Sequence, residues 1–285
     1  MRIAHIIMVH KNPAQLQRLI KRLEHPNFDV YIHLDKKIDI ADFKYLENRP
    51  QVNFINNRVK CNWGGWSFTT AIIRSMKEVL GSPRKYDFIN LISAQDYPIY
   101  PAEELYHFFE DKEGKNFIYF SEQKSKWFND ALSRYEKYHF TDQSFKGKYL
   151  LQWMVNKIVP IRKLPDNMTL YGGSNSSWWT ISKDCASYVV DKIDGNVKFN
   201  NFFKYSWGSD EFVITSIIMN SHFRDQCVNN NFRYIDWSAG GGHPKTLLME
   251  DLANIKNSKM LFARKFDIKL DSDVLDELDK NTFAD

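Results

Sequence analysis

An alternation of apolar runs with helix-forming segments constrains the fold of this chain more than any other feature. Residues 3–9 form a nearly continuous apolar run, and similar runs follow at residues 30–34, 52–55 and 88–92. Strands without a polar face are typical of parallel sheets that helices cover on both sides. The four runs are therefore predicted to be buried strands.

Two helices are predicted between these strands. Apolar residues recur at helical spacing over residues 13–23. A second helix is predicted over residues 67–80, because Gly81 and then Pro83 follow it in the order typical of a helix stop. Strands that alternate with helices predict an α/β fold with a mostly parallel, doubly wound, Rossmann-like sheet and helices on both faces.

Composition predicts one globular domain and argues against some partners. Hydrophobic residues make up 43% and charged residues 26%, a globular balance, and no Pro/Gly/Ser-rich linker divides the 285 residues. The net charge of +4 is too small to make nucleic-acid binding the default for a chain of this size. Eight Trp and fourteen Tyr suit sugar rings and interfaces, because these side chains combine a flat apolar face with a polar edge.

Cysteine spacing and the lack of long apolar segments indicate a location. Cys61, Cys185 and Cys227 are far apart and form no CxxC pair, which favours unpaired buried thiols in a reducing compartment over disulfides or zinc. No apolar stretch reaches the ~18 residues of a membrane span, and no signal-peptide pattern precedes the first strand. We therefore expect a cytoplasmic protein, with peripheral contact at the inner face of the membrane as an alternative.

Polar side chains follow three of the predicted strands. His10 follows the first strand, Asp35 the second, and Gln95 and Asp96 the fourth, where Pro98 is expected to stop further pairing. Doubly wound sheets bind ligands in the crevice beyond the carboxyl ends of their strands, so these groups are candidates for a ligand site. The structural alternative is that Asp35 caps a helix and Asp96 forms a turn.

The middle of the chain mixes aromatic and basic residues. Residues 124–163 interleave Trp, Tyr and Phe with Lys and Arg, among them Arg134. Such a pattern could serve nucleic acid, an anionic membrane or a polymeric acceptor. The preferred interpretation is a solvated face above a helical core.

Two adjacent carboxylates precede an apolar segment. Asp210 and Glu211 follow Ser209, a predicted N-cap, and residues 212–219 are predicted to be helical. In the first turn of that helix the dipole would favour both negative charges, so structure alone could explain them.

Seven stretches occur in a fixed order along the chain, namely YIHLDKK, NWGGWS, LISAQDYPI, GGSNSSWWTIS, GSDEFVITSI, RYIDW and FARKFD. Taken together, they resemble the Core-2/I-branching β-1,6-N-acetylglucosaminyltransferases, a family whose domain peptide O-xylosyltransferases share. The resemblance covers the chain to about residue 267. Animal members carry an N-terminal membrane anchor that is missing here, so we expect a bacterial-type member.

The resemblance implies a GT-A-like fold and the inverting transfer of a sugar to a hydroxyl group of a cell-surface glycan. The donor that it favours is UDP-GlcNAc, from which GlcNAc would be transferred. Residues 1–120 would bind the nucleotide sugar, and residues 121–285 would bind the acceptor and carry catalysis. Glu211 matches the family's catalytic base, and Asp210 would secure its loop. Asp96 would orient the donor sugar or act closer to the chemistry.

The resemblance also implies a donor site without a divalent metal or other cofactor. The position of the usual Asp-x-Asp motif reads Ala94-Gln95-Asp96, and the Asp-x-Asp at residues 271–273 looks like a helix start. Lys265 and Lys245 match the segments that supply basic side chains to the diphosphate. The branching enzymes have Arg where Lys245 stands, so a bidentate contact would become a point charge. Gln95 belongs to the same donor site, and His10 and Asp35 would face the uracil and ribose.

On the acceptor side, Trp237 aligns with a Trp that stacks on sugar, and Arg134 lies in a matching RYE segment. The expected partners are a UDP-sugar and a glycan or glycoconjugate acceptor, not nucleic acid. One alternative is a xylosyltransferase-like enzyme that uses UDP-xylose or another UDP-sugar. The other is a carbohydrate-binding protein without catalytic activity.

Overall fold

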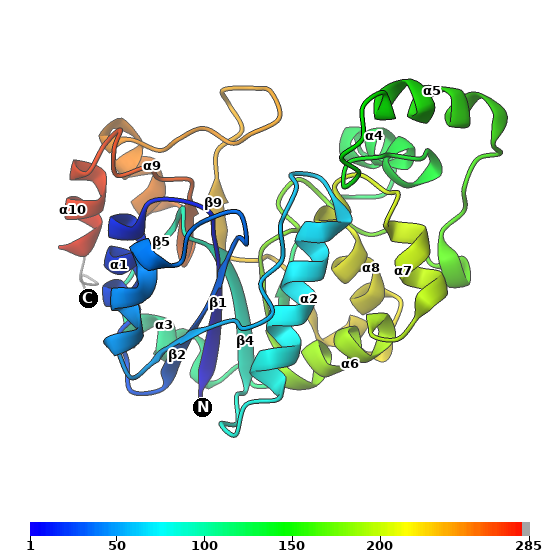
Figure 1. The fold of residues 1–285 in the computed structure, drawn as a ribbon. Helices are drawn as coiled ribbons and strands as arrows, with labels where there is room; N and C mark the ends of the chain where they lie inside the picture. The colour runs from blue at the N-terminus through cyan, green and yellow to red at the C-terminus, as the bar shows by residue number, and fades with distance from the viewer. Residues whose placement is uncertain (281–285) are drawn as a thin grey trace.

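The structure is a computed structural model of the chain, and it describes residues 1–280. Within these residues the central sheet has seven strands in the order β3-β2-β1-β4-β7-β6-β8 (Figure 1). Their bounds are Ile3–Val9 (β1), Phe28–Leu34 (β2), Val52–Phe54 (β3), Phe88–Ser93 (β4), Asn116–Ile118 (β6), Trp179–Ser182 (β7) and Cys227–Asn229 (β8). β1 is parallel to β2 and β4, and β3 and β8 are parallel to β2 and β6. β7 runs antiparallel to both of its neighbours, so the sheet is mostly parallel, as predicted.

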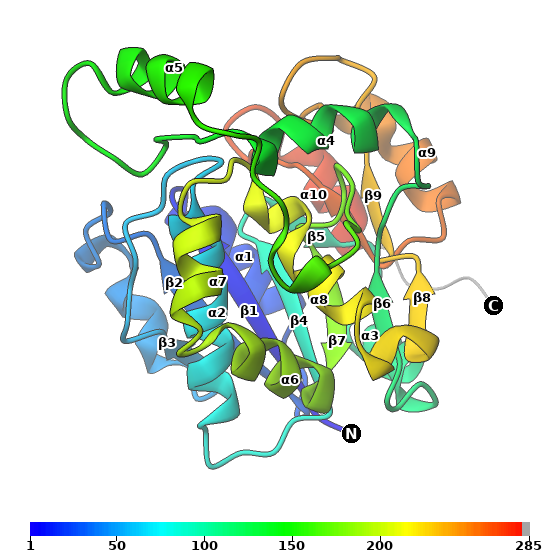
Figure 2. The same cartoon turned by 90° about the vertical axis from the view of Figure 1, so that its right-hand side faces the viewer.

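Helices cover both faces of this sheet, which confirms the predicted doubly wound α/β fold (Figures 1 and 2). The predicted helices at residues 13–23 and 67–80 agree closely with α1 and α2. One face carries α1 (Pro13–Arg22), α3 (Ala102–Glu110) and α10 (Asp273–Asp279). The other carries α2 (Trp66–Leu80), α6 (Lys183–Ile193) and α8 (Val213–Met219).

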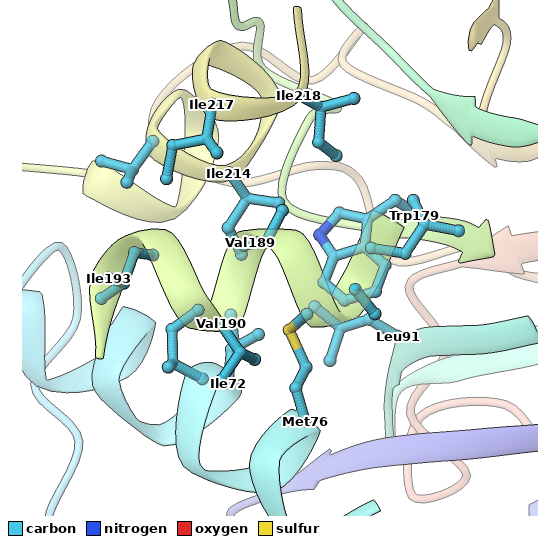
Figure 3. Close-up of a cluster of buried hydrophobic side chains, with 14 of the residues drawn as sticks. Ile72, Met76, Leu91, Trp179, Val189, Val190, Ile193, Ile214, Ile217 and Ile218 are labelled. Carbon is cyan, nitrogen blue, oxygen red and sulfur yellow. The ribbon is translucent and has the colours of Figure 1, made fainter. Parts of the chain in front are cut away.

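Each face of the sheet has its own hydrophobic core. In β1, Ile3 and Ile7 contribute to one core while Ala4 and Ile6 contribute to the other, because successive side chains of a strand point to opposite faces. Figure 3 shows the second core, where side chains of α2, α6 and α8 surround Trp179 of β7. Full burial of one such aliphatic or aromatic side chain contributes about 1.5–3 kcal/mol.

A small second sheet joins the segment after β4 to the C-terminal part of the chain. Its strands are β5 (Asp96–Pro98), β10 (Phe262–Arg264) and β9 (Arg233–Ile235), in that order. The expectation that Pro98 ends pairing is wrong, because Pro98 lies opposite Phe262 in the antiparallel β5–β10 ladder. Proline is tolerated there because β5 is an edge strand.

The remaining elements lie around the two sheets. The middle of the chain forms α4 (Lys126–Glu136) and α5 (Lys148–Ile158). The interpretation as a solvated face above a helical core holds for α4, which buries Ala131 and Tyr135, but not for α5, which buries no residue. Among residues 1–280 no helix is long and apolar enough to cross a membrane, and all three cysteines are unpaired. The other helices are α7 (Val197–Phe203) and α9 (Leu252–Asn257), and the short 3-10 helices are Ala41–Asn48, Pro165–Asn167, Ser209–Glu211, His222–Gln226 and Met249–Asp251.

Candidate active site

A cleft of about 440 Å³ opens at the carboxyl ends of β1 and β4. This is the edge where a doubly wound sheet binds its ligands. The cleft is lined by residues from strand ends, loops and the start of α2 that are far apart in the sequence, within 8–10, 33–37, 61–68, 93–95, 174–178, 207–211, 235–244 and 264–265. Four of the five predicted donor-site residues, one predicted acceptor residue and the predicted base therefore share one cavity.

His10 and Asp35 line the cleft at the ends of the first two strands. Burial, and then the neighbouring Lys11, lower the pKa of His10, which favours a neutral imidazole that can both donate and accept a hydrogen bond. Asp35 accepts a hydrogen bond from the backbone N–H of Lys37 at 2.9 Å, so it also shapes the turn after β2. The structural interpretation and the ligand-site interpretation of Asp35 are thus compatible.

Lys265 lines the cleft together with Gln95, and it differs from Lys11, a cation near it in space but far from it in the sequence. The ammonium of Lys11 is held by Asp267 at 2.6 Å, whereas no carboxylate within residues 1–280 forms an ion pair with Lys265. Burial and the positive charges of Arg264 and Lys11 lower the pKa of Lys265. A partly buried ammonium that forms no ion pair favours an anionic ligand, because a negative charge there would offset its partial desolvation.

Lys245 does not line the cleft, although His243 and Pro244 do. Its Nζ lies 2.7 Å from Asp251 Oδ1 and 2.9 Å from Glu250 Oε1, and these hydrogen bonds raise its pKa. The structure therefore separates the two lysines that the sequence grouped as a diphosphate site. A contact between Lys245 and a ligand in the cleft would require both carboxylates to release it.

Asp96 lies beneath the cleft and not in its wall. The side chain is fully buried and accepts a hydrogen bond from the backbone N–H of Ser93 at 2.9 Å. Its Oδ1 lies 3.4 Å from Nη1 of Arg264, the residue opposite it in the β5–β10 ladder. Burial raises the pKa of Asp96 and Arg264 opposes this. Asp96 thus contacts and positions Arg264 but does not reach the cavity.

Arg264 is a cleft residue that the sequence analysis missed. Its guanidinium lies 4.1 Å from the ring centre of Trp178, and its side chain is 11% exposed. Two fixed neighbours, the Trp178 ring and the Asp96 carboxylate, orient a cation toward the cavity. The signal was present in FARKFD, but only the adjacent lysine was selected from that stretch.

Asp210 and Glu211 lie in a separate 3-10 turn before α8, so the prediction of one helix with both in its first turn is wrong. Phe212 has φ −146° and ψ −26°, which breaks the helix between Glu211 and Val213. Ser209 does not cap α8, because its hydroxyl is hydrogen-bonded to Thr69 Oγ1 at 2.8 Å.

The backbone around this turn is tightly constrained. Gly208, which precedes the turn, has φ +62°, a conformation that favours glycine. A Cβ at Gly172 would collide with the Glu211 carbonyl oxygen and lie 2.8 Å from Phe212 Cβ. Gly208 and Gly172 therefore both constrain the backbone of Glu211, one at the start of the turn and the other by packing against it.

The carboxylate of Glu211 lines the cleft, and two side chains outside the cleft lining hold it by hydrogen bonds. Its Oε2 accepts hydrogen bonds from Arg134 Nη1 at 2.6 Å and from Trp127 Nε1 at 3.1 Å. Burial raises the pKa of Glu211, the neighbouring Asp210 raises it further, and Arg134 lowers it. Asp210 is itself anchored, because its Oδ2 accepts a hydrogen bond from Ser177 Oγ at 2.7 Å. With Oε2 engaged by two donors, Oε1 is the oxygen available to a substrate proton.

Arg134 and Trp237, the predicted acceptor residues, occupy different positions. Arg134 is not a cleft residue, and its guanidinium lies between the rings of Trp127 and Trp207 at 5.5 Å and 4.7 Å from their centres. Trp237 lines the cleft just after β9, and its Nε1 donates to Asn175 Oδ1 at 2.7 Å. Arg134 therefore supports Glu211, whereas Trp237 can contact a ligand.

Trp63 is a further cleft residue that sequence reasoning did not single out. It is 63% exposed, and its ring lies 5.1 Å from Trp207 in an edge-to-face arrangement and 5.2 Å from His243. The lining of the cleft therefore combines aromatic rings, those of Trp63, Trp207 and Trp237, with the cation Lys265. The NWGGWS motif contained this residue, but nothing in its spacing says which Trp faces the cavity.

The structure places no set of metal ligands in this region. Within residues 1–280 no group of three or more His, Cys, Asp or Glu side chains is arranged to hold a metal ion. The Asp-x-Asp at residues 271–273 starts α10 as predicted, with Asp271 Oδ1 accepting from the backbone N–H of Asp273 at 2.9 Å.

Comparison with known proteins gives consistent matches over the whole chain. The family model described as Core-2/I-Branching enzyme matches residues 3–260. A xylosyltransferase of Ciona intestinalis is 25% identical over 304 residues, which covers 100% of this chain and 34% of the relative. Xylosyltransferase 2 of Rattus norvegicus is 28% identical over 308 residues, covering 99% of this chain and 34% of the relative. The chain thus spans about a third of the length of the curated relatives it matches.

Two solved structures also match. The apo structure of the bifunctional glycosyltransferase WbbM has a TM-score of 0.42 at 10% identity and covers 92% of this chain and 45% of that chain. The apo form of mouse xyloside xylosyltransferase 1 has a TM-score of 0.40 at 9% identity and covers 92% of this chain and 97% of that chain. At these TM-scores neither likeness bears on the chemistry of the cleft.

Proposed function

Because the chain belongs to the Core-2/I-branching enzyme family, we propose that it is an inverting glycosyltransferase, which moves a sugar from a UDP-sugar to a hydroxyl group of a glycan acceptor. The observation that carries this proposal is the pairing, in one cleft, of a carboxylate held by Arg134 with the cations Arg264 and Lys265. Inverting transfer needs both kinds of group in one cleft, the base for the acceptor hydroxyl and the cations for the departing diphosphate.

Glu211 is the proposed general base. Its free oxygen takes the proton of the acceptor hydroxyl while the hydroxyl oxygen bonds to the anomeric carbon and the bond from that carbon to the diphosphate breaks. Burial raises the pKa of Glu211, which strengthens it as a base, while Arg134 opposes this rise and favours the ionised form. General base catalysis supplies about 10²–10⁴-fold, or roughly 3–5 kcal/mol.

Lys265 and Arg264 are proposed to receive the negative charge that develops on the departing UDP. Fixed cations in a partly buried site act strongly on such charge, because little solvent screens them and they need not reorganise. Asp96 acts here through Arg264 as a positioning residue. Trp237 and Trp63 would stack on acceptor sugars.

We propose that the reaction needs no divalent metal, since basic side chains occupy the donor side of the cleft and the strand-end Asp-x-Asp is replaced by Ala94-Gln95-Asp96. Transfer should survive EDTA at full rate. Loss of transfer in EDTA, with recovery in manganese, would contradict this part of the proposal.

The donor sugar has two candidates. UDP-GlcNAc is the donor implied by the β-1,6-branching enzymes, and UDP-xylose is favoured by the names of the relatives that match 99% to 100% of this chain. Xylose lacks the hydroxymethyl group and GlcNAc carries an N-acetyl group, so one cleft should discriminate between them. A thermal-shift screen of UDP, UDP-xylose and UDP-GlcNAc tests this, because a ligand at 100 times its Kd stabilises by about 2.7 kcal/mol.

Binding alone does not distinguish an enzyme from a carbohydrate-binding protein. The screen should therefore be followed by product analysis with each UDP-sugar that binds and a panel of glycan acceptors. Release of UDP that depends on the acceptor supports transfer. Acceptor binding without UDP release, for every donor that binds, would favour the non-catalytic alternative.

A further inference from the structure

The helix α5 is built with its polar side toward the protein and its apolar side toward solvent. Gln152 and Asn156, one turn apart, face inward: Gln152 Oε1 accepts from the backbone N–H of Phe140 at 2.8 Å. Asn156 bonds both backbone groups of Tyr138, at 2.7 Å and 2.8 Å. A surface helix of a globular protein normally has the opposite polarity.

The outward side of α5 and its flanks is an exposed apolar surface. Tyr149 is 69% exposed, Trp153 59% and Ile158 83%, and no residue of the helix is buried. We call this surface, with its neighbours, the α5 face. Its apolar members are Phe145, Tyr149, Leu150, Leu151, Trp153, Met154, Ile158, Val159 and Ile161. Apolar side chains gathered in this way mark a binding surface, because scattered single residues would need no explanation.

The segment that carries the α5 face is positively charged throughout. Residues 143–163 contain four lysines and one arginine and no aspartate or glutamate. Arg162 is turned inward, where its guanidinium donates to the carbonyl oxygens of Lys137 at 3.1 Å and Tyr205 at 2.9 Å, and so anchors the segment. The four lysines remain at the surface, and three of them, Lys146, Lys157 and Lys163, are exposed.

The α5 face lies at the same end of the molecule as the cleft. In both views α5 stands beyond the carboxyl ends of the parallel strands, at the end opposite the N-terminus (Figures 1 and 2). The cleft residue Val9 ends β1, and the cleft residues His10 and Gln95 follow the ends of β1 and β4. Whatever covers the α5 face would therefore lie on the side of the molecule where the cleft opens.

We propose that the α5 face is a docking surface for an anionic lipid bilayer. Tyr and Trp beside aliphatic residues suit the boundary between headgroups and acyl chains, and the lysines around them suit acidic headgroups. A second copy of this chain fits less well, because pairing the same face would bring two segments with excess positive charge together. Docking through this face would bring the cleft end of the molecule to the bilayer.

Cosedimentation with vesicles tests the proposal on the full-length chain. Vesicles of phosphatidylcholine mixed with phosphatidylglycerol should bind the protein at low salt, while vesicles of phosphatidylcholine alone should bind it far more weakly. High salt should reduce binding to the mixed vesicles. Each lysine replaced by Gln, at Lys146 or Lys157, should weaken partition into the mixed vesicles by roughly fivefold.

The apolar contribution is tested with the double variant Leu150→Glu, Ile158→Glu. It should weaken binding to the mixed vesicles by more than about tenfold, since two apolar side chains can no longer be buried. Val197→Glu is the matched control, because Val197 of α7 is 69% exposed but lies outside the α5 face. Unfolding temperatures should be unchanged for all three positions, since none of them is buried.

Three results would overturn the proposal. The first is no binding to the mixed vesicles at low salt. The second is equal binding of the double variant and the Val197→Glu control. The third is a wild-type dimer in sedimentation velocity that the double variant dissolves, which would show that a second copy covers the α5 face.

Discussion

Replacing Arg134 with Gln should raise the pKa of Glu211 and move the acid side of the pH-rate profile to higher pH. In the folded protein burial and Asp210 raise this pKa, while Arg134, with Nη1 at 2.6 Å from Glu211 Oε2, lowers it. Both side chains are less than a quarter exposed, at 17% and 22%, so solvent screens their interaction only in part. A hydrogen bond to a charged group is worth about 1.5–3 kcal/mol, and 1.36 kcal/mol equals one pKa unit. The acid limb of the kcat/KM profile should therefore move to higher pH by about 1–2 pH units.

The assay is the pH dependence of kcat/KM for sugar transfer in three variants. Arg134→Lys retains a positive charge and should return the acid limb toward its wild-type position, even if packing between the two Trp rings suffers. Arg74→Gln removes one exposed positive charge from α2, away from the cleft, and should leave the profile unchanged.

The reasoning fails if the acid limb of Arg134→Gln stays in place while its rate falls at every pH. That result would make Arg134 a purely structural residue between Trp127 and Trp207. It also fails if Arg134→Lys behaves like Arg134→Gln, because charge would then not be the property that matters.

Three further predictions concern the donor side, the acceptor side and stability. Lys265→Ala should weaken UDP binding by about 10–100-fold, which corresponds to the loss of one charge-assisted hydrogen bond. The control Lys269→Ala changes a residue outside the cleft and should leave UDP binding unchanged. Equal Kd values of the two variants for UDP in calorimetry would contradict this. Trp237→Ala should raise the acceptor KM more than the donor KM, whereas equal losses with a lower Tm would indicate a core role. Burial lowers the pKa of His33 from 6.5 to about 4, so the unfolded chain binds the extra proton and stability should fall by up to about 3 kcal/mol as pH drops through this window. In urea titrations at several pH values, His33→Gln should weaken the pH dependence of the free energy of unfolding. An unchanged pH dependence would show that it comes from other groups.

The parts of the fold that could be predicted from the sequence are those with a long repeating pattern. β1 and α2 each have enough consecutive residues for the period to be read, and their bounds agree with the expected ranges within two residues. The strands β5, β9 and β10 have three residues each, too few to show a period. β10 pairs with β9 across 29 residues of chain and with β5 across more than 160 residues, and no local pattern reports such pairing.

The same contrast between local patterns and long-range contacts explains which residues of the candidate site could be predicted. His10, Asp35 and Gln95 could be located because each follows a strand whose end defines the cleft edge. The position of Asp96 beneath the cleft depends on Arg264, a partner 168 residues away in the chain, so the carboxylate that ends an apolar strand supports a cation and does not itself reach the cavity.

The local structure of Glu211 was misjudged for a related reason. An apolar run after two acidic residues predicts one continuous helix, and only the conformation of Phe212, packed in the core beside the Gly172 backbone, separates the turn from α8. For the region of α5 the sequence predicts only a solvated face above a helical core. Which side of α5 the protein covers depends on Gln152 and Asn156, which bond the backbone of another segment.

The most direct test of the proposed mechanism is the kinetics of Glu211→Gln. The amide retains the shape of the side chain and can still bond Trp127, but it cannot accept a proton, so kcat should fall by at least ~10²-fold while the Kd for UDP stays nearly the same. Asp96→Asn, which changes a residue outside the cavity, should affect UDP binding through Arg264 and lower kcat less. If Glu211→Gln retains most of its kcat while Asp96→Asn loses it, Glu211 is not the base and the central claim is wrong.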